Sequence, residues 1–446
     1  MQTSHSSVIR GARVYHGGRF AQADVRIDAG RIAAVGGDVD ASGAETIDAG
    51  GLLLLPGVID VQVHFREPGL TDKEDLGSGS RAAAVGGVTA YLEMPNTRPP
   101  AVDQAGIDDK LDRAARTSRV HYGFFVGATP HNIAELQTIK RVCGIKVFMG
   151  SSTGDLLVDD PADLERIFAQ TRPDLVVAVH AEDEALIRAN FARHRHRDDP
   201  AAHSDVRDAE AAWRASSLAV GLARKHGHRL HVLHLTTARE TSLFEAGDAL
   251  VTAECSPLHL LLDTSDYARL GSLARVNPAL KTAGDRAGLW RALHEGRIAC
   301  IATDHAPHLL AEKQRPAWQA PSGMPLVENS LALMLDAAAR GLCTYEEVAL
   351  WMCEAPAALY GIEGKGRIEA GYDADLVLVD PDLVREVRNE DQLTRAGWSP
   401  WHGCSLQGWP VRTFVRGRTV ARDHRIVDDD VRGDALRFAW EQRPER

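Results

Sequence analysis

Eight short apolar runs recur between residues 57 and 304, and longer segments separate most of them. The longer segments can each hold a crossover helix, and residues 209–225 repeat apolar side chains at helical spacing. Strands that alternate with helices build a parallel sheet, and eight such units close into a barrel. We therefore predict a (β/α)8 barrel. Its expected strands are residues 57–64, 89–94, 121–126, 145–149, 175–180, 230–234, 249–254 and 298–304.

Five of these strands end in side chains that can bind a metal. They are His64, Lys146, His180, His234 and Asp304, at the ends of the first, fourth, fifth, sixth and eighth strands. A single histidine in such a place is usually an ordinary core or surface residue. Five such residues at one rim indicate a functional site instead, because the active site of a (β/α)8 barrel lies at the carboxyl ends of its strands. The pattern predicts a metal site that activates water.

Lys146 is the unusual member of this set. A buried ammonium group would be repelled by a metal dication and would lose its hydration. It can avoid this by losing its proton, or by reacting with CO₂ to form an anionic carbamate that bridges two metals. A third interpretation, a lysine paired with an acid at the rim, stays open.

Residues 8–55 and 366–422 share a different pattern of short β-strands separated by glycine-rich turns. Neither segment has enough strands for a core of its own. We therefore expect one small β-sandwich domain built from both ends of the chain, with the barrel inserted into it. The predicted boundaries are 1–55 plus 368–446 for this domain and the C-terminal tail, and 56–367 for the barrel.

Composition excludes several classes of partner. The chain has 446 residues and a formal net charge of −11, which disfavours binding to the phosphates of nucleic acids. No apolar run reaches the roughly 18 residues of a membrane span, and residues 1–7 lack an apolar signal core. The six cysteines are dispersed without a CxxC pair, as expected of reduced thiols. We expect a cytoplasmic protein that binds neither nucleic acid nor membrane.

Several motifs together resemble the dihydroorotases of the amidohydrolase superfamily. The resemblance extends from about residue 8 to 420. It rests on the order of the segments 64–69 (HFREPG), 94–97 (MPNT), 145–152 (IKVFMGSS), 180–182 (HAE), 303–308 (TDHAPH) and 371–376 (GYDADL).

The resemblance implies reversible closure of N-carbamoyl-L-aspartate to L-dihydroorotate, a step of pyrimidine synthesis. It implies one or two Zn²⁺ ions held by His64, a CO₂-derived carbamate on Lys146, His180, His234 and Asp304. A metal-activated hydroxide would attack the ring amide. Asp304 would be the catalytic residue that carries the proton to the leaving nitrogen.

The same resemblance implies a binding site for a small substrate with a carboxylate. Arg66 and Asn96 would hold that carboxylate with help from His308, since a guanidinium matches the geometry of a carboxylate. Asn277 would be another substrate contact, and Gly323 would contribute backbone from a loop.

Gln62 departs from the family pattern. The family usually has a histidine here, two residues before His64, and side chains two apart on a strand share a face. An amide oxygen is a poorer zinc ligand than imidazole, so Gln62 is expected to be a weak or absent ligand. The metal count therefore stays open.

Two alternatives remain. A related cyclic amidase, such as an allantoinase or a hydantoinase, would use the same barrel and metals but would need the carboxylate-binding Arg66 less. An inactive homologue that scaffolds aspartate transcarbamoylase would explain Gln62, but it would not need the other ligands. A homo-oligomer, for example a dimer, is expected in either case.

Overall fold

Eight parallel strands form the centre of the molecule in the computed structural model, which describes residues 6–151 and 156–442. The strands lie side by side in chain order, and all eight of the predicted runs contribute one. They are β6 (Val58–Val63), β7 (Val88–Glu93), β8 (His121–Gly127), β9 (Gly144–Phe148), β10 (Val177–His180), β11 (Leu230–Val232), β12 (Val251–Cys255) and β13 (Cys300–Ile301).

The barrel closes between its first and last strands. A parallel bridge joins Val63 to His305, and the His64 N–H donates to the His305 carbonyl at 2.8 Å. The last strand, Cys300–Ile301, is shorter at both ends than predicted. Beyond it, Asp304 adopts a left-handed backbone conformation (φ 51°). The predicted barrel is therefore confirmed.

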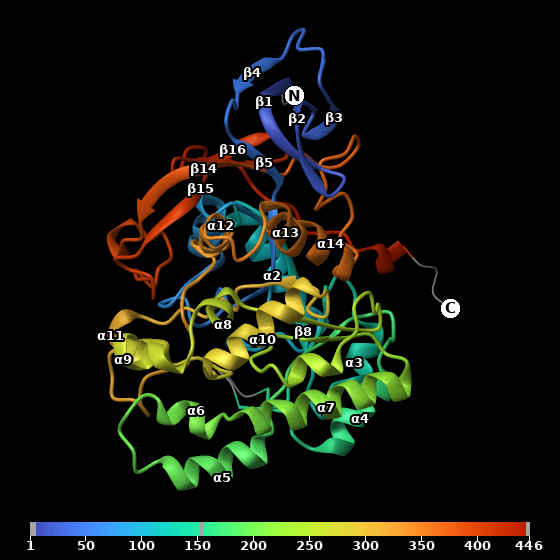
Figure 1. Cartoon of the computed structure of the whole chain (residues 1–446). Coiled ribbons are helices and arrows are strands. Elements are labelled where there is room, and N and C mark those ends of the chain that lie inside the picture. Colours follow the sequence, from blue (N-terminus) through green and yellow to red (C-terminus); the bar gives the residue numbers. More distant parts are fainter. Residues whose placement is uncertain (1–5, 152–155, 443–446) are drawn as a thin grey trace.

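Helices cover the outside of the barrel, as Figure 1 shows for α7 and α10. Helix α7 begins where the Asp208 side chain accepts from the Ala211 N–H, and it ends at Gly227 (φ 62°). The helices are α1 (Leu76–Val85), α2 (Gln104–Thr117), α3 (Ile133–Thr138), α4 (Pro161–Gln170), α5 (Glu184–His194), α6 (Ala202–Val206), α7 (Ala209–His226), α8 (Pro257–Leu261), α9 (Tyr267–Leu270), α10 (Ala283–His294), α11 (Leu310–Lys313), α12 (Ser330–Ala339), α13 (Tyr345–Ala349) and α14 (Ala355–Tyr360).

A second sheet joins the two ends of the chain, as predicted. Strand β5 pairs with N-terminal β1 on one side and with C-terminal β14 on the other (Figure 1). Its strands are β1 (Ser6–His16), β2 (Arg19–Asp28), β3 (Arg31–Gly36), β4 (Glu45–Asp48), β5 (Leu53–Pro56), β14 (Leu376–Glu386), β15 (Ser405–Val415), β16 (Arg418–Arg422) and β17 (Arg425–Ile426). This β-sandwich has its own apolar core, which includes Ile9, Ile27 and Phe414. The precise domain boundaries stay a prediction.

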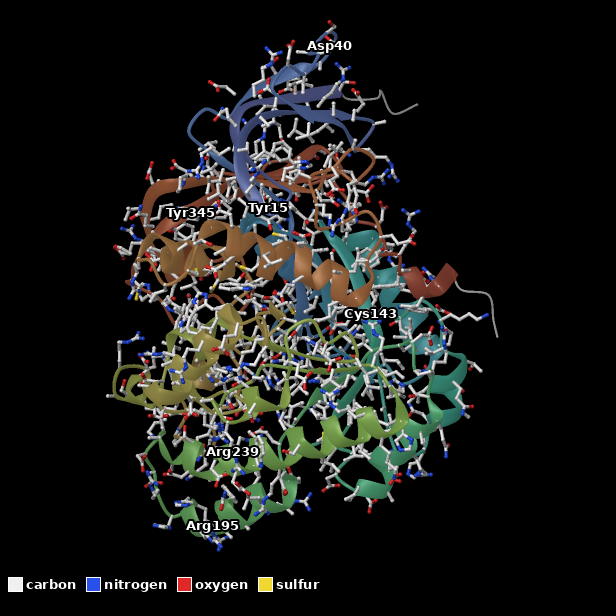
Figure 2. The ribbon with its side chains drawn as sticks, turned by 45° about the vertical axis from the view of Figure 1, so that its right-hand side comes forward. Tyr15, Asp40, Cys143, Arg195, Arg239 and Tyr345 are labelled. Atoms are coloured by element: carbon white, nitrogen blue, oxygen red, sulfur yellow. The ribbon has the colours of Figure 1, made fainter. Side chains whose placement is uncertain are left out.

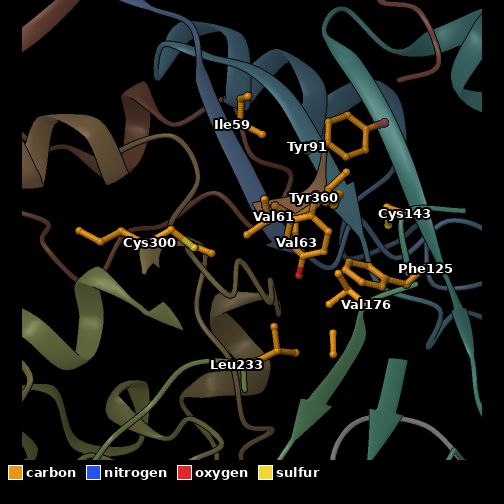
Figure 3. Close-up of a cluster of buried hydrophobic side chains, with 14 of the residues drawn as sticks. Ile59, Val61, Val63, Tyr91, Phe125, Cys143, Val176, Leu233, Cys300 and Tyr360 are labelled. Carbon is orange, nitrogen blue, oxygen red and sulfur yellow. The ribbon is translucent and has the colours of Figure 1, made fainter. Parts of the chain in front are cut away.

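The barrel core is filled by side chains from both its strands and α14. Figure 3 shows Val61, Val63 and Phe125 around Tyr360, which α14 contributes. The Phe125 and Tyr360 rings are in edge contact, with centroids 5.8 Å apart. All six cysteines are free thiols, as predicted.

The C-terminal segment returns to the barrel. A bridge joins Ala435 to Tyr122 on β8. In Figure 2, Asp40 marks the outer end of the β-sandwich and Arg195 the opposite end of the molecule. Among the described residues, no helix combines the length and apolarity that crossing a membrane requires.

Candidate active site

One pocket at the carboxyl ends of the barrel strands collects nearly all of the predicted site residues. Its lining consists of Gln62, His64, Arg66, Asn96, Lys146, Phe148, His180, His234, Asn277, Asp304, Ala306, Ser322 and Gly323. His308 is the one predicted site residue outside this lining.

His64 and Asp304 face each other across the first and last strands. His64 Nε2 lies 3.1 Å from Asp304 Oδ1, and His64 Nδ1 lies 2.8 Å from Asn96 Oδ1. When His64 Nδ1 donates to the Asn96 amide oxygen, the other ring nitrogen, Nε2, carries a lone pair. This lone pair lies beside the Asp304 carboxylate oxygen, and the two together suit a bound cation. Gln62 Nε2 donates to the same Asp304 oxygen at 3.0 Å, so Gln62 holds this carboxylate in place.

His180 and His234 form a second group of candidate ligand atoms. His180 Nδ1 lies 2.9 Å from His234 Nε2, while His180 Nε2 lies 2.8 Å from Glu182 Oε2. A carboxylate on one ring nitrogen leaves the other nitrogen as the ligand. Burial lowers the pKa of His64, His180 and His234, and neutral imidazoles are the form that binds metal.

Lys146 is buried and lines the same pocket, but it is the middle residue of β9 and not its end as predicted. Its Nζ lies 4.5 Å from the centre of the Phe148 ring, and no hydrogen bond reaches it from residues 6–151 or 156–442. Burial lowers its pKa to about 7. An amine of this kind is partly unprotonated at neutral pH and can react as a nucleophile.

Three pocket residues have left-handed backbone conformations. The φ angles are 66° at Arg66, 37° at His234 and 51° at Asp304. Such conformations are uncommon for residues other than glycine, and they concentrate at functional sites. Here they occur where the chain leaves three strands, and they turn these side chains into the pocket.

Arg66 is a buried cation that carboxylates such as Asp304 and Glu93 affect through their charge but do not contact directly. Only 1% of the residue is exposed, and burial lowers its pKa to about 10. Its Nε donates to the Pro307 carbonyl at 3.3 Å, and Nη2 lies 3.4 Å from His308 Nε2. No carboxylate of the described residues forms an ion pair with it. The pocket therefore offers a guanidinium to an incoming anion.

The remaining predicted substrate contacts are held by their neighbours. Asn277 Oδ1 lies 3.0 Å from His203 Nε2. The Gly323 N–H donates to the Arg275 carbonyl at 3.0 Å, and its φ of 137° is one that side chains rarely allow. His308 lies behind Arg66, with Nε2 3.1 Å from the Ser322 carbonyl.

No role was predicted from the sequence for Glu182, Arg207 or Phe148. Glu182 belongs to the HAE motif, and its position two residues after His180 could have drawn attention to it. Burial by itself would raise its pKa, but Arg207 and His180 lower it to about 2. Arg207 had no such signal, because it approaches Glu182 from 25 residues further along the chain.

A separate trio of His231, Glu254 and Cys300 lies buried on β11, β12 and β13, with ligand atoms within 4.8 Å of one another. His231 Nε2 lies 3.0 Å from Glu254 Oε2, and Nδ1 lies 2.9 Å from Thr252 Oγ1. Both ring nitrogens thus have protein partners. Burial also raises the pKa of the Cys300 thiol far above its usual value, so the thiolate that binds metal is disfavoured.

Comparisons with known proteins agree with this geometry. A model of the amidohydrolase family matches residues 53–420. A dihydroorotase of Halobacterium salinarum is 41% identical over 399 residues, 89% of this chain and 93% of that protein. An allantoinase of Rubrobacter xylanophilus is 37% identical over 456 residues, covering 98% of both chains. The solved structure of an L-hydantoinase from Arthrobacter aurescens superposes with a TM-score of 0.91 at 29% identity, covering 97% of this chain and 99% of that one.

Proposed function

The chain belongs to the amidohydrolase family, and we propose that it is a dihydroorotase, which interconverts N-carbamoyl-L-aspartate and L-dihydroorotate. One observation carries the choice of substrate. Arg66 is a buried cation that lines the pocket and lacks an anionic partner among the described residues. Both compounds carry a carboxylate that such a guanidinium would bind.

His64, Lys146, His180, His234 and Asp304 are the proposed ligands of one or two Zn²⁺ ions. Their imidazole and carboxylate groups suit this metal, and all five line one pocket. When bound, the metal would supply a Lewis acid that polarises the amide carbonyl and lowers the pKa of a water molecule. Gln62 would contribute weakly or not at all, because its amide nitrogen is directed at Asp304.

Lys146 is proposed to carry a carbamate. The unprotonated amine would attack CO₂, form the N–C bond and release one proton, which leaves an anionic carbamate. Two observations support this step: the amine pKa of about 7, and the absence of a hydrogen bond to Nζ from the described residues. The product would add negative charge where an ammonium group would repel a dication.

Asp304 is proposed to move the proton. For ring opening, its carboxylate would take a proton from the attacking water and deliver it to the ring nitrogen as the amide bond breaks. Burial would raise its pKa, but the hydrogen bond with His64 and the nearby His234 and Lys146 lower it to about 2. Arg66 and Asn96, at the ends of the first two barrel strands, would orient the substrate carboxylate.

The allantoinase alternative has a relative in its favour, the Rubrobacter xylanophilus protein. Allantoin and hydantoin are neutral rings, however, and would offer no carboxylate to the Arg66 guanidinium. The scaffold alternative depended on Gln62 alone, and the amide of this residue hydrogen bonds to Asp304 in a pocket that all five proposed ligands line.

The deciding experiment is a substrate panel on the zinc-loaded chain. We expect turnover of L-dihydroorotate and N-carbamoyl-L-aspartate at rates far above those for allantoin and hydantoin. Asp304→Asn, which keeps an oxygen but removes the base, should lose a factor on the order of 10²–10⁴ in turnover and serves as the negative control. A preference for allantoin or hydantoin would replace the proposal by the alternative.

Two further properties are proposed, a cellular location and an oligomeric state. A cytoplasmic location would agree with six free cysteines, since disulfides are rare in that compartment. A homo-oligomer, such as a dimer, can be tested by light scattering of the purified chain.

A further inference from the structure

Arg207 follows α6 and lies beside the pocket without lining it. Its guanidinium is buried and makes two hydrogen bonds, with Nη1 donating to Glu182 Oε2 and Nη2 donating to the Ser151 carbonyl. These partners lie 25 and 56 residues away along the chain. The planar guanidinium has its donors at fixed angles, so it holds the two segments in one geometry.

The contact between Arg207 and Glu182 supports His180, a proposed metal ligand. The Glu182 oxygen that accepts from Arg207 also lies 2.8 Å from His180 Nε2. It orients the ring so that His180 Nδ1 faces His234. Glu182 is fully buried, and without Arg207 it would lose its strongest cationic partner.

The contact between Arg207 and the Ser151 carbonyl supports Asn277, a proposed substrate contact. The Ser151 carbonyl accepts from Asn277 Nδ2 at 3.5 Å as well as from Arg207. Asn277 is held from its other side by His203 of α6, whose Nε2 lies 3.0 Å from Asn277 Oδ1. One short segment, residues 202–207, therefore supports both sides of the pocket.

We infer that Arg207 is a positioning residue that couples the orientation of His180, on the metal side, to that of Asn277, on the substrate side. The inference rests on the proposed function, because it takes His180 as a ligand and Asn277 as a substrate contact. It implies that a single substitution outside the pocket changes both metal binding and substrate binding.

The test uses Arg207→Met in the full chain. Zinc affinity is measured by competition with a chromogenic chelator in the absence of substrate, and KM and kcat are measured with L-dihydroorotate at saturating zinc. We expect zinc affinity to fall 10- to 100-fold, as is usual when a partner of a ligating histidine is lost. We also expect KM to rise several-fold while kcat changes less.

Arg207→Lys and Arg214→Met are the matched controls. A lysine at position 207 can keep the contact with either Glu182 or Ser151 but not both. It should therefore partly restore either zinc affinity or KM. Arg214 forms an exposed ion pair with Glu210 on α7, and its loss should change neither zinc affinity nor KM. Circular dichroism checks that each variant folds. If Arg207→Met does not fold, the same measurements are made on Glu182→Gln and Arg207→Lys.

A double variant tests the route through Glu182. If Arg207 acts on His180 through this carboxylate, Arg207→Met combined with Glu182→Gln should lose no more zinc affinity than the worse single variant. A folded Arg207→Met chain with parental zinc affinity overturns the inference, and so does weaker zinc binding with an unchanged KM. If the parent chain does not turn over dihydroorotate, the proposed function fails, and the substrate side of the inference fails with it. Zinc affinity then still decides whether Arg207 positions His180.

Discussion

Arg66 has the most direct consequence at the scale of a single residue. Arg66→Met keeps an unbranched side chain but removes the only buried guanidinium that lines the pocket in the described part of the chain. Truncating one partner of a buried charged hydrogen bond costs about 2–5 kcal/mol, which should appear as a loss in kcat/KM for dihydroorotate. Zinc content, measured by mass spectrometry of the metal, should stay at the parental level. Parental kcat/KM in this variant would show that the carboxylate binds elsewhere.

Lys146 can be tested through the modification itself. Lys146→Ala should bind less zinc and lose turnover, because the proposed carbamate cannot form. A short carboxylic acid such as propionate should restore part of both by occupying the vacated space. In the parent chain, labelled bicarbonate should give a carbamate signal by ¹³C NMR. Absence of that signal in an active, zinc-loaded sample would exclude the modification.

Gln62 should set the strength of one metal position. Its Oε1 has no hydrogen-bond partner among the described residues, while its Nε2 is directed at Asp304. We expect one tightly held Zn²⁺ and a second that exchanges. Gln62→His should raise the zinc stoichiometry after dialysis against dilute chelator, and each tenfold gain in affinity corresponds to about 1.4 kcal/mol. Two equally tight zinc ions in the parent chain would contradict this expectation.

At the scale of elements, the connection between β14 and β15 supports the substrate side of the pocket. Residues 387–404 extend from the β-sandwich to the barrel, where the buried Trp398 donates its Nε1–H to the His308 carbonyl at 2.8 Å. Glu328 anchors the same connection by accepting from the Leu393 N–H at 2.9 Å. The connection therefore fixes the residue that contacts Arg66.

Trp398→Phe tests this support. The ring stays, but the His308 carbonyl loses its donor, which costs about 1–3 kcal/mol for a buried group. We expect a higher KM for dihydroorotate with unchanged zinc content. Trp409→Phe is the matched control, since Trp409 donates to the nearby Leu406 carbonyl within its own strand. Equal effects of the two substitutions on KM would mean that the connection has no special role.

At the scale of the whole molecule, Asp375 joins the β-sandwich to the barrel. Its Oδ1 lies 3.1 Å from His121 Nε2 on β8 and accepts from the Arg416 N–H at 2.8 Å, while Oδ2 pairs with Lys365. Burial would raise the pKa of this carboxyl, but His121 and Lys365 lower it far below its usual value. The folded state thus prefers the ionised form.

This preference predicts an acid-dependent contribution to stability. A carboxyl with a depressed folded pKa stabilises the protein above its unfolded pKa of about 3.9, and the contribution is lost as the pH falls below that value. Asp375→Asn should lose about 3–5 kcal/mol of unfolding free energy at neutral pH, and this difference from the parent should shrink toward pH 3. Urea unfolding of the parent and the variant between pH 7 and pH 3 measures the loss at neutral pH and its decrease toward pH 3. Asp428→Asn, which breaks an exposed pair with Arg418, should change stability little at any pH.

The repeating pattern of the sequence determined the barrel and much of the pocket. Parallel strands meet with their carboxyl ends at one rim, so residues that end successive apolar runs must lie together there. That rule accounts for His64, His180, His234 and Asp304, whereas Lys146 reaches the same pocket from the middle of β9. The roles of Arg66 and Asn277 came from the family motifs, and only their placement is visible in the structure.

Tertiary structure alone decided how these side chains are supported. Arg207 reaches Glu182 across 25 residues, Trp398 reaches His308 across 90, and His121 reaches Asp375 across 254. Local periodicity predicts which face of a strand or helix is buried. It does not predict which polar group, distant in the chain, will pair with a buried polar side chain. Each buried charge or carbonyl needs a partner, and the identity of that partner follows from the packing of elements that are far apart in the chain.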